Sequence, residues 1–579
     1  MAPVSPIHTV HSECQDCNKC LRHCPVQAIK VLNGQADVMP KRCIACGRCV
    51  SSCPRRAKRV RYDLDKARAL IAAGGKVIAS LAPSWRGTLR QNRPQIIAAM
   101  KALGFAGISE TALGAQELSI RTAALLNQSG PGLYISSACP VIVDYVLAYQ
   151  PAFAANIIPF ASPALTHARL LKDEYGEKTS VIFIGPCFGK KNEADRNPDL
   201  ISVALTFGEL KVWLEDAKEI SVKDLLLDDE EAKFQPGRAY EGALYPLDGG
   251  MNETIRRVGV KDEVQLLNLA SLDLFVEALS ELDTGAIVRP LFIEALACAG
   301  GCVAGPGIAS KRSAFLKMSA VLRHVVDRDV VPQSPKVVVP AVYAPAGLTA
   351  NEHTLEEIED ALHRLGKYAP EDQINCSGCG YPSCRDLARA LLDGNAEPSM
   401  CISHMRLLAT RKAAAMIKSM PSAMVMVDEN LKIIEVNEGF LRMFTGGAES
   451  PYLGHPERLV GESVENWLEF SGLFRRVLKT GEDVYREHRP YKKRLYDLHI
   501  FNVDKHKILG AMVTDVTTLG LARERTANRA REVISKNISI VQEIACLLGE
   551  HMVETETLLS AIAEDYGDDG GQDEAEGNQ

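Results

Sequence analysis

Cysteines dominate the residues of this chain that could do chemistry. All of its 17 cysteines except Cys546 fall into four sets of four. Four thiolates hold one 4Fe–4S cubane, so this arithmetic predicts four clusters and a protein that handles electrons. The four sets are Cys14, Cys17, Cys20 and Cys24; Cys43, Cys46, Cys49 and Cys53; Cys376, Cys379, Cys384 and Cys401; and Cys139, Cys187, Cys298 and Cys302.

The first two sets repeat the pattern C-x2-C-x2-C-x3-C-P near the start of the chain. In paired runs of this kind, the fourth cysteine of each run ligates the cluster of the other run. The pattern resembles that of bacterial two-cluster ferredoxins, and two zinc knuckles are the alternative. The predicted ligand sets are Cys14, Cys17, Cys20 and Cys53 for one cubane, and Cys43, Cys46, Cys49 and Cys24 for its neighbour.

Composition narrows the class of protein. The 66 basic and 73 acidic side chains give a net charge of −7, without a basic block that could bind nucleic-acid phosphates. No secretory signal opens the sequence, so the C-x2-C tandems indicate metal ligands and not disulfides. Charged residues and prolines interrupt every apolar stretch long before the ~20 residues that span a bilayer. We therefore expect a cytoplasmic protein without a nucleic-acid or membrane partner.

The elements that must position these cysteines suggest a multidomain α/β and α+β protein of about three to five domains. After the cysteine-dense start, apolar strand-like runs alternate with helical patterns, which predicts an α/β domain. The runs are Lys76–Ala82, Leu133–Ser136 and Val181–Gly185, and the helical patterns are Pro94–Ala102 and Pro163–Glu174. The predicted segments are a two-cluster ferredoxin-like domain (1–62), the α/β domain (63–345), a small Fe–S domain with a linker helix (346–412), an α+β domain (413–518), a coiled-coil-like helix (519–560) and a disordered acidic tail (561–579).

The scattered cysteines each lie in a turn of small residues, at Ser136–Pro140, Gly185–Glu193 and Phe292–Cys302. A single buried cysteine in such a turn is usually structural. Three of these turns in one domain favour metal ligands instead, because glycine lets the backbone approach a bulky group closely. Their four thiols again match one cubane.

The three turns resemble the signature motifs of the catalytic domain of diiron hydrogenases, and the resemblance covers roughly residues 1–345. It implies that a 4Fe–4S cubane is held by Cys139, Cys187, Cys298 and Cys302. It further implies that Cys302 bridges to a two-iron unit carrying CO, cyanide and a dithiolate. Lys190 would donate a hydrogen bond to a cyanide and Glu193 would support it, since a buried anionic ligand favours a positioned cationic donor.

The main departure from that family concerns proton delivery. The residue directly before the first ligand is a proton-passing cysteine in catalytic members, and here it is Ala138, which has no titratable proton. The family's acidic and serine relay groups are also missing from the neighbourhoods of Ser119–Thr122 and Ile158–Pro159. General acid–base transfer contributes about 10²–10⁴-fold to a rate. We therefore expect slow turnover, with water or another route supplying protons.

Two later segments resemble known modules. The third cysteine set resembles the small Fe–S domain of several electron-transfer and corrinoid-linked proteins, with a zinc site as the alternative. Met420–Asp428 and Ile433–Phe440 resemble the start of a PAS domain. Behind them, hydrophobic residues recur at intervals of seven, which fits either a coiled-coil seam between two copies or a helix packed on its own chain. These residues are Ile534, Val541 and Leu548.

Together these features resemble the sensory, PAS-containing group of diiron hydrogenases. That resemblance implies a slow hydrogenase-type oxidoreductase that interconverts H2 with protons and electrons and passes its redox state through 4Fe–4S relays to the PAS domain. Its partners would be H2, protons, a redox partner such as ferredoxin, a downstream signalling protein and a second copy of the chain. One alternative is a working ferredoxin-linked hydrogenase with another proton path. The other is a hydrogenase-like Fe–S scaffold that lacks the diiron unit.

Overall fold

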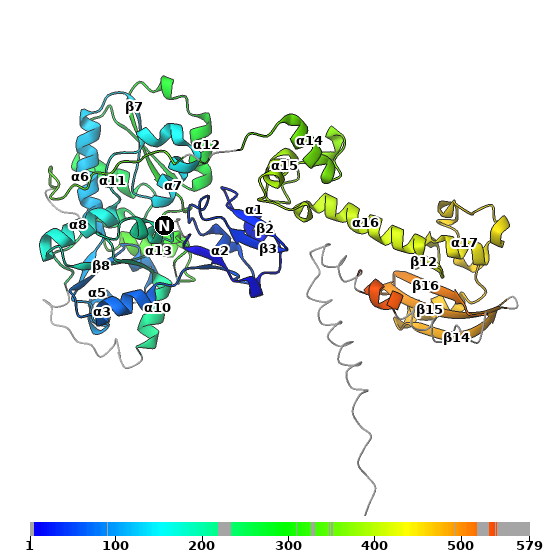
Figure 1. Ribbon diagram of the computed structural model, residues 1–579. Coiled ribbons are helices and arrows are strands. Elements are labelled where there is room, and N and C mark those ends of the chain that lie inside the picture. Colours follow the sequence, from blue (N-terminus) through cyan, green and yellow to red (C-terminus); the bar gives the residue numbers. More distant parts are fainter. Residues whose placement is uncertain are drawn as a thin grey trace, which may run out of the picture. The chain divides into compact units, whose positions relative to one another are not determined.

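The computed structural model describes residues 5–89, 91–217, 233–308, 310–325, 331–346, 348, 351–491, 494–517, 532–538 and 540. The chain divides into two compact units, Met1–Met400 and Cys401–Gln579, and Figure 1 labels their elements. Residues 532–538 are helical. The rest of the predicted helix 519–560, including Val541, Cys546 and Leu548, lies almost entirely outside the described residues, as does the predicted tail 561–579.

Two short antiparallel strand pairs frame the cysteine-dense start of the chain. The elements are β1 (Ile7–Thr9), α1 (Lys19–Arg22), β2 (Ile29–Leu32), β3 (Gln35–Val38), α2 (Arg48–Ser52) and β4 (Lys58–Val60). β1 pairs with β4, and β2 forms a hairpin with β3. Each cysteine run enters a short helix behind a residue in the left-handed conformation, Asn18 or Gly47. This repeated arrangement is the ferredoxin-like fold that the sequence predicts.

Two parallel sheets form the core of the α/β domain in the described part of the chain. The strands are β5 (Val77–Leu81), β6 (Gly107–Glu110), β7 (Gly132–Ile135), β8 (Ser180–Gly185), β9 (Val203–Thr206), β10 (Gln265–Ala270) and β11 (Pro290–Leu296). One sheet has the order β6-β5-β8-β9 and the other the order β10-β11-β7. β5 and β11 are buried along their whole length, as expected of central strands whose two faces are both covered.

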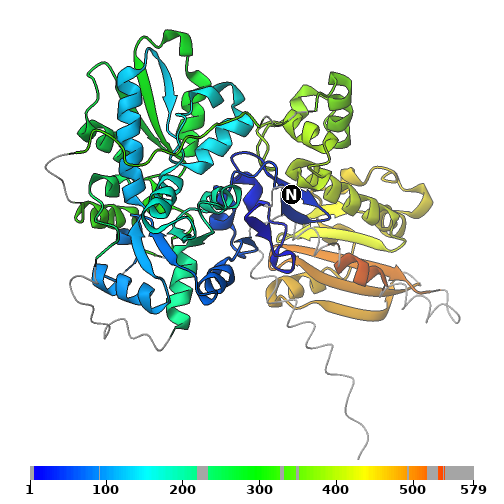
Figure 2. The same cartoon turned by 60° about the vertical axis from the view of Figure 1, so that its left-hand side comes forward.

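Helices flank these strands on both sides (Figures 1 and 2). They are α3 (Leu64–Ala72), α4 (Trp85–Thr88), α5 (Arg93–Ala102), α6 (Ala112–Gln128), α7 (Pro140–Tyr149), α8 (Pro163–Tyr175), α9 (Gly189–Arg196), α10 (Phe207–Asp216), α11 (Gly250–Val258), α12 (Leu272–Glu281) and α13 (Ala314–Leu322). The Asn92 and Gln95 side chains form a capping box at the start of α5. The predicted helices at Pro94–Ala102 and Pro163–Glu174 are confirmed as α5 and α8, within one residue at each end.

The small Fe–S segment contributes α14 (Leu355–Arg364) and α15 (Cys384–Leu392) to the first unit. Their apolar faces pack together around Ile358, Leu362 and Ala388. The second unit opens with α16 (Ile402–Ser419). The helix expected after the third cysteine set is therefore confirmed.

An antiparallel sheet in the order β13-β12-β16-β15-β14 forms the rest of the described second unit. Its elements are β12 (Ala423–Asp428), β13 (Ile433–Val436), α17 (Glu438–Phe444), α18 (Gly472–Thr480), β14 (Val484–Tyr491), β15 (Arg494–Asp504) and β16 (Ile508–Asp515). Tyr496, Leu498 and Ile500 alternate into the core along β15, the pattern of a sheet with one buried face. The predicted α+β fold of this segment is confirmed.

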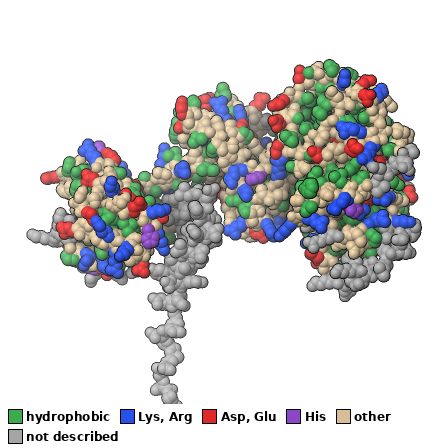
Figure 3. All heavy atoms as spheres, turned by 180° about the vertical axis from the view of Figure 1, so that it is seen from behind, with side chains coloured by type: hydrophobic (Ala, Val, Ile, Leu, Met, Phe, Trp, Pro, Cys, Tyr) green, Lys and Arg blue, Asp and Glu red, His purple; other side chains and the backbone are tan. Residues whose placement is uncertain are grey.

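The visible face of the molecule carries charged side chains of both signs (Figure 3). Among the described helices, none combines the length and the apolar character that crossing a bilayer requires.

Lys191 of α9 ties the N-cap of α3 to β9 and α10 within the α/β domain. Its side chain is fully buried, and Nζ donates to Asp63 Oδ2 at 2.9 Å, to Glu209 Oε1 at 3.0 Å and to Ala204 O at 3.1 Å. Although burial alone would raise the pKa of Asp63, the charge and hydrogen bond of Lys191 hold it below its usual value. One buried cation thus serves two buried carboxylates.

Replacing this cation should destabilise the first unit. Lys191→Met removes the buried cation that Asp63 and Glu209 share. Of these two, among the described residues, only Asp63 keeps another cationic partner, such as Arg61 at 2.9 Å. We therefore expect a loss of about 3 kcal/mol in unfolding free energy, measured by urea denaturation. The control is Lys211→Met, since Lys211 is exposed and pairs with Glu215 at 3.5 Å; an exposed pair contributes about 0–1 kcal/mol. Equal losses in the two variants would contradict the role assigned to Lys191.

Candidate metal centre

The carboxyl ends of three parallel strands carry the three cysteine turns. Cys139 follows β7 and is the N-cap of α7, Cys187 follows β8, and Cys298 follows β11. In open α/β sheets, ligands bind in the crevice outside the carboxyl ends of the strands. The topology therefore directs turns that are distant in sequence to one region of the domain.

Direct contacts join these turns. Ser136 N donates to Ile293 O at 3.0 Å, which ties the first turn to β11. A Cβ on Gly189 would lie 2.9 Å from the Val141 side chain and 3.6 Å from Cys187 Sγ, so a larger residue there would push the first two turns apart. Gly301 has a φ of +86°, and a Cβ on it would overlap Pro246 O. Glycine is therefore required between the last two cysteines.

Burial and mutual repulsion govern the four thiols of these turns. Burial raises the pKa of Cys139, and burial together with the charge of Cys139 raises that of Cys187 to about 12. Burial and then the other thiols of the set raise the pKa values of Cys298 and Cys302. The four sulfurs thus act on one another, and they need cations among them to exist as thiolates. The iron of a 4Fe–4S cubane supplies such cations, so the donor set fits that group.

No three His, Cys, Asp or Glu side chains among the described residues lie close enough together to bind a single metal ion. The ligands of a cubane are arranged differently, because each thiolate binds a different iron.

Lys190 and Glu193 form a hydrogen-bonded triangle with Ser162. Lys190 Nζ donates to Glu193 Oε2 at 2.6 Å and to Ser162 Oγ at 2.8 Å, and Ser162 Oγ donates to Glu193 Oε2 at 2.9 Å. All three residues are buried. The charge of Lys190 opposes the rise in the pKa of Cys302 that burial causes, so the ammonium lies within electrostatic reach of the thiols. An ammonium has three N–H donors, and this triangle uses two of them.

A cavity of about 400 Å³ opens beside this triangle. Glu193, Arg196 and Tyr343 supply polar groups to its wall, and Ser137 brings it to the turn that contains Ala138. Arg196 pairs with Asp144 at 2.6 Å. Apolar side chains such as Val143 and Leu165 make up more of the wall than these polar groups, and the cavity is large enough to hold water.

Two buried polar groups, one within β11 and one in the turn after β5, were not predicted from the sequence. Glu294 lies on β11, where Oε2 accepts a hydrogen bond from Asn252 N at 2.8 Å and Oε1 has no partner among the described residues. Burial raises the pKa of Glu294 to about 7, and its charge acts on Cys302. Ser84 Oγ, in the turn after β5, is likewise buried without a described partner. A lone glutamate inside an otherwise apolar strand was the signal that could have revealed Glu294.

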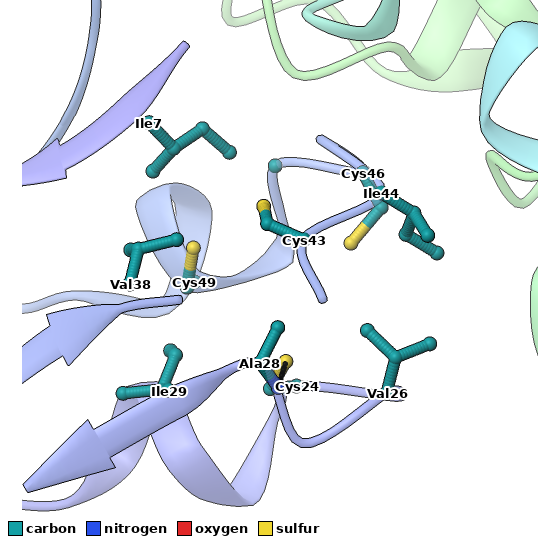
Figure 4. Close-up of a pocket in the computed structure, with 11 residues that line it drawn as sticks. Ile7, Cys24, Val26, Ala28, Ile29, Val38, Cys43, Ile44, Cys46 and Cys49 are labelled. Atoms are coloured by element: carbon teal, nitrogen blue, oxygen red, sulfur yellow. Dashed lines mark hydrogen bonds between the residues drawn. The ribbon is translucent and has the colours of Figure 1, made fainter. Parts of the chain in front are cut away.

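The structure brings Cys24 to the second cysteine run of the ferredoxin-like domain, as Figure 4 shows. Apolar side chains such as Ile7 and Ile29 line the same pocket as Cys24, Cys43, Cys46 and Cys49. In the other set, burial raises the pKa of Cys20 to about 11, Lys58 opposes this, and the charges that add to it are those of Cys17, Cys14 and Cys53. In both groupings the fourth cysteine of one run lies with the first three cysteines of the other run, as the sequence predicts. That these cysteines bind clusters stays a prediction.

The third cysteine set is divided between the two units. Cys376, Cys379 and Cys384 lie in the first unit, where Cys384 N donates to Asn375 Oδ1 at 2.8 Å at the start of α15. Cys401 is the N-cap of α16 in the second unit.

The predicted ligand sets can be tested by iron analysis. Anaerobic reconstitution of the cubanes alone should load about 16 iron atoms per chain, four for each set of cysteines. We expect Cys139→Ala to lower this by about four, measured as iron and acid-labile sulfide. The control is Cys546→Ala, at the cysteine outside the four sets, which should leave the content unchanged. An unchanged content in Cys139→Ala would remove Cys139 from the ligand set.

Comparisons with known proteins agree with these domains. Residues 75–306 match the family model of the iron only hydrogenase large subunit, C-terminal domain, and this match includes all four scattered cysteines. Residues 7–54 match a 4Fe–4S dicluster domain, residues 372–403 an Fe–S cluster domain, and residues 411–482 a PAS domain. No curated protein matches the chain by sequence.

Several solved FeFe-hydrogenases align with half of the chain. One, described in work on oxygen inactivation of the H cluster 2Fe subcluster, is 15% identical, with a TM-score of 0.38, and the alignment covers 50% of this chain and 100% of that one. A variant of the FeFe-hydrogenase of Chlamydomonas reinhardtii is 16% identical, with a TM-score of 0.37 and the same coverage. A domain of an HTR-like protein from Haloarcula marismortui is 20% identical, with a TM-score of 0.14, over 17% of this chain and 100% of that one.

The family models show which domains the chain contains. Residues 75–306 match a hydrogenase-type domain that includes the three cysteine turns, and 4Fe–4S domains and a PAS domain lie on the same chain.

Proposed function

We propose that this protein is a hydrogen-sensing diiron hydrogenase of low turnover, which couples H2/H+ redox chemistry at an H-cluster through 4Fe–4S relays to its PAS domain. One observation carries the proposal: four mutually interacting thiols, one buried and three half-buried, lie within electrostatic reach of the Lys190–Ser162–Glu193 triangle, with Ala138 directly before the first thiol.

The H-cluster, when bound, supplies the centre at which H2 is split or formed and electrons are exchanged. Its cubane would be held by Cys139, Cys187, Cys298 and Cys302. Lys190 Nζ keeps one N–H donor beyond the triangle, which suits a cyanide of the two-iron unit. Glu193 and Ser162 fix that ammonium in place, and burial strengthens each of these charge-assisted hydrogen bonds.

Proton delivery is the step that this chain handles poorly. Ala138 can neither give nor take a proton, so protons must come from the water that the neighbouring cavity can hold. Glu193 lines that cavity and accepts a hydrogen bond from Lys190. Its carboxyl would therefore be the group that passes protons between the cavity and the site. The missing thiol would account for a rate lower by about 10²–10⁴-fold.

The ferredoxin-like domain adjoins the site and suits an electron relay. The charge of Cys46 acts on Cys298, and the pKa of the Arg48 guanidinium responds to both thiols. The set with Cys43 and Cys46 therefore lies next to the hydrogenase-type site. Cys17 of the other set is exposed, which offers an exit for electrons to a carrier such as ferredoxin.

The PAS domain would transmit the redox signal to partner proteins. Asn437 is the N-cap of α17, and its Nδ2 donates to Ser422 O at 2.8 Å and to Ile417 O at 3.2 Å. It thus holds the end of α16 on the PAS sheet, and α16 begins directly after the predicted ligand Cys401. A downstream signalling protein, and a second copy bound through the PAS domain and the C-terminal helix, are the proposed partners.

Infrared spectroscopy tests the central claim. In anaerobically matured protein we expect absorption bands of iron-bound CO and cyanide, and we expect exposure to H2 to shift them because the oxidation state of the iron changes. Cys302→Ala should lose the bands while Cys546→Ala keeps them. A matured wild-type protein without such bands would overturn the proposal in favour of an Fe–S scaffold that lacks the diiron unit.

Restoring a thiol tests the explanation for slow turnover. Ala138→Cys should raise H2 evolution at least tenfold, within the range of about 10²–10⁴ expected for general acid–base transfer. The control is Ser137→Cys, which places a thiol one residue earlier in the same turn and should not raise the rate. An unchanged rate in Ala138→Cys, or an equal rise in both variants, would contradict this account.

A working hydrogenase with another proton path is the second candidate function. The observation that favours it is Glu294, a carboxyl with a free oxygen, a pKa raised to about 7 and an electrostatic effect on Cys302. A general acid works best when its pKa lies near the operating pH. High turnover in the matured wild-type protein would support this function over sensing.

A further inference from the structure

The cysteine loop of the small Fe–S domain packs directly on the ferredoxin-like domain. A Cβ on Gly380 would lie 3.0 Å from both the carbonyl carbon and the Cβ of Leu21. Gly380 directly follows Cys379, and Leu21 directly follows Cys20. The loop that follows Cys379 thus packs at van der Waals distance on the backbone of α1, which carries Cys20.

Tyr381 lies at the same junction. It directly follows Gly380 and is 5% exposed. The ring is therefore packed in the interior beside the contact between Gly380 and Leu21.

A second contact fixes the orientation of the two domains. Asn33 N, in the turn between β2 and β3, donates to Glu397 Oε1 at 2.7 Å. Because this contact lies on a different loop from Gly380, the two together resist rotation of the small domain about either one.

Helix α7, which begins at the hydrogenase-type site, also contacts the ferredoxin-like domain. α7 begins behind Cys139 and ends at Tyr149, whose hydroxyl donates to Arg42 O at 2.6 Å. The same hydroxyl also lies 3.3 Å from Val26 O. The end of α7 therefore adjoins the segments that follow Cys24 and precede Cys43.

We propose that Gly380 and Tyr381 form an electron-transfer contact between the ferredoxin-like domain and the small Fe–S domain, which makes the latter a side branch of the relay. One electron leaves a reduced cluster of the first domain and reduces the cluster of the second, and no bond is made or broken. The inference rests on the clusters that the proposed function assigns to both domains. Electrons from the site would then divide between the exit at Cys17 and the domain whose cysteine set ends at Cys401.

Gly380 is essential to this contact for two reasons. Its φ of +86° is a conformation that residues with a Cβ adopt at a cost, and a Cβ would press against Leu21. Gly394 of the same domain also has a positive φ, +66°, but nothing lies within 4 Å of its Cβ position. Gly394→Ala therefore matches the backbone strain of Gly380→Ala without disturbing the contact.

The test uses the full chain, reduced with dithionite in the absence of H2, so its outcome does not depend on hydrogen chemistry. Electron paramagnetic resonance should show magnetic interaction between reduced clusters in the wild type. Gly380→Ala should lose the part of this interaction that involves the small domain, at unchanged iron content, while Gly394→Ala keeps it. Iron analysis of the wild type separately reports whether the clusters required by the proposed function are present.

A second pair of variants covers the case in which Gly380→Ala fails to load iron. Tyr381→Leu keeps an apolar side chain at the junction but removes the ring, and it should weaken the same interaction. Its control is Tyr368→Leu, at a tyrosine of the same domain that is 67% exposed. Unchanged interaction in Gly380→Ala or Tyr381→Leu, equal losses in a variant and its control, or iron loss in both junction variants would overturn the proposal.

Discussion

Four thiols that act on one another are the constraint on which this structure depends, one of them buried and three half-buried. Without cations among them, burial and neighbouring sulfurs hold them in the neutral form, and Lys190 offsets only part of that effect. Gly189 and Gly301 let these turns pack closely on their neighbours, because a Cβ on either would overlap Val141 or Pro246. The local backbone therefore holds the turns together, and the local electrostatics favour a metal centre.

Neighbouring lysines of α9 show how the fold separates chemistry from stability. Adjacent residues of a helix point about 100° apart, so Lys190 contacts Ser162 and Glu193 while Lys191 reaches Asp63 and Glu209. The first ammonium lies near the cysteines, and the second pairs with buried carboxylates at the starts of α3 and α10. One short helix thus supports the site and ties together elements of the α/β domain.

The first unit brings several of its cysteine sets near one another. The charge of Cys46 acts on Cys298, Cys24 lies with the second cysteine run, and Gly380 of the small Fe–S domain contacts Leu21, directly after Cys20. The second unit begins with the last cysteine of the third set and continues through α16 to Asn437 of the PAS domain. Along the chain, the third cysteine set therefore stands between the hydrogenase-type domain and the PAS domain.

Much of this could be predicted from the sequence. Cysteine spacing within a run is a local property, so it indicated the clusters, and apolar periodicity indicated the parallel strands, α5, α8 and the PAS sheet. The offsets of Lys190 and Glu193 from Cys187 singled them out in the same way. Ala138 was identified by its position directly before Cys139 alone.

Tertiary structure alone decided which distant groups meet. Ser162 completes the triangle with Lys190, and Gly380 contacts Leu21, yet no local spacing relates these pairs. Local patterns specify the backbone conformation of each turn and strand. Electrostatic and packing contacts depend instead on how the sheets and domains come together in space, which no single stretch of the sequence encodes.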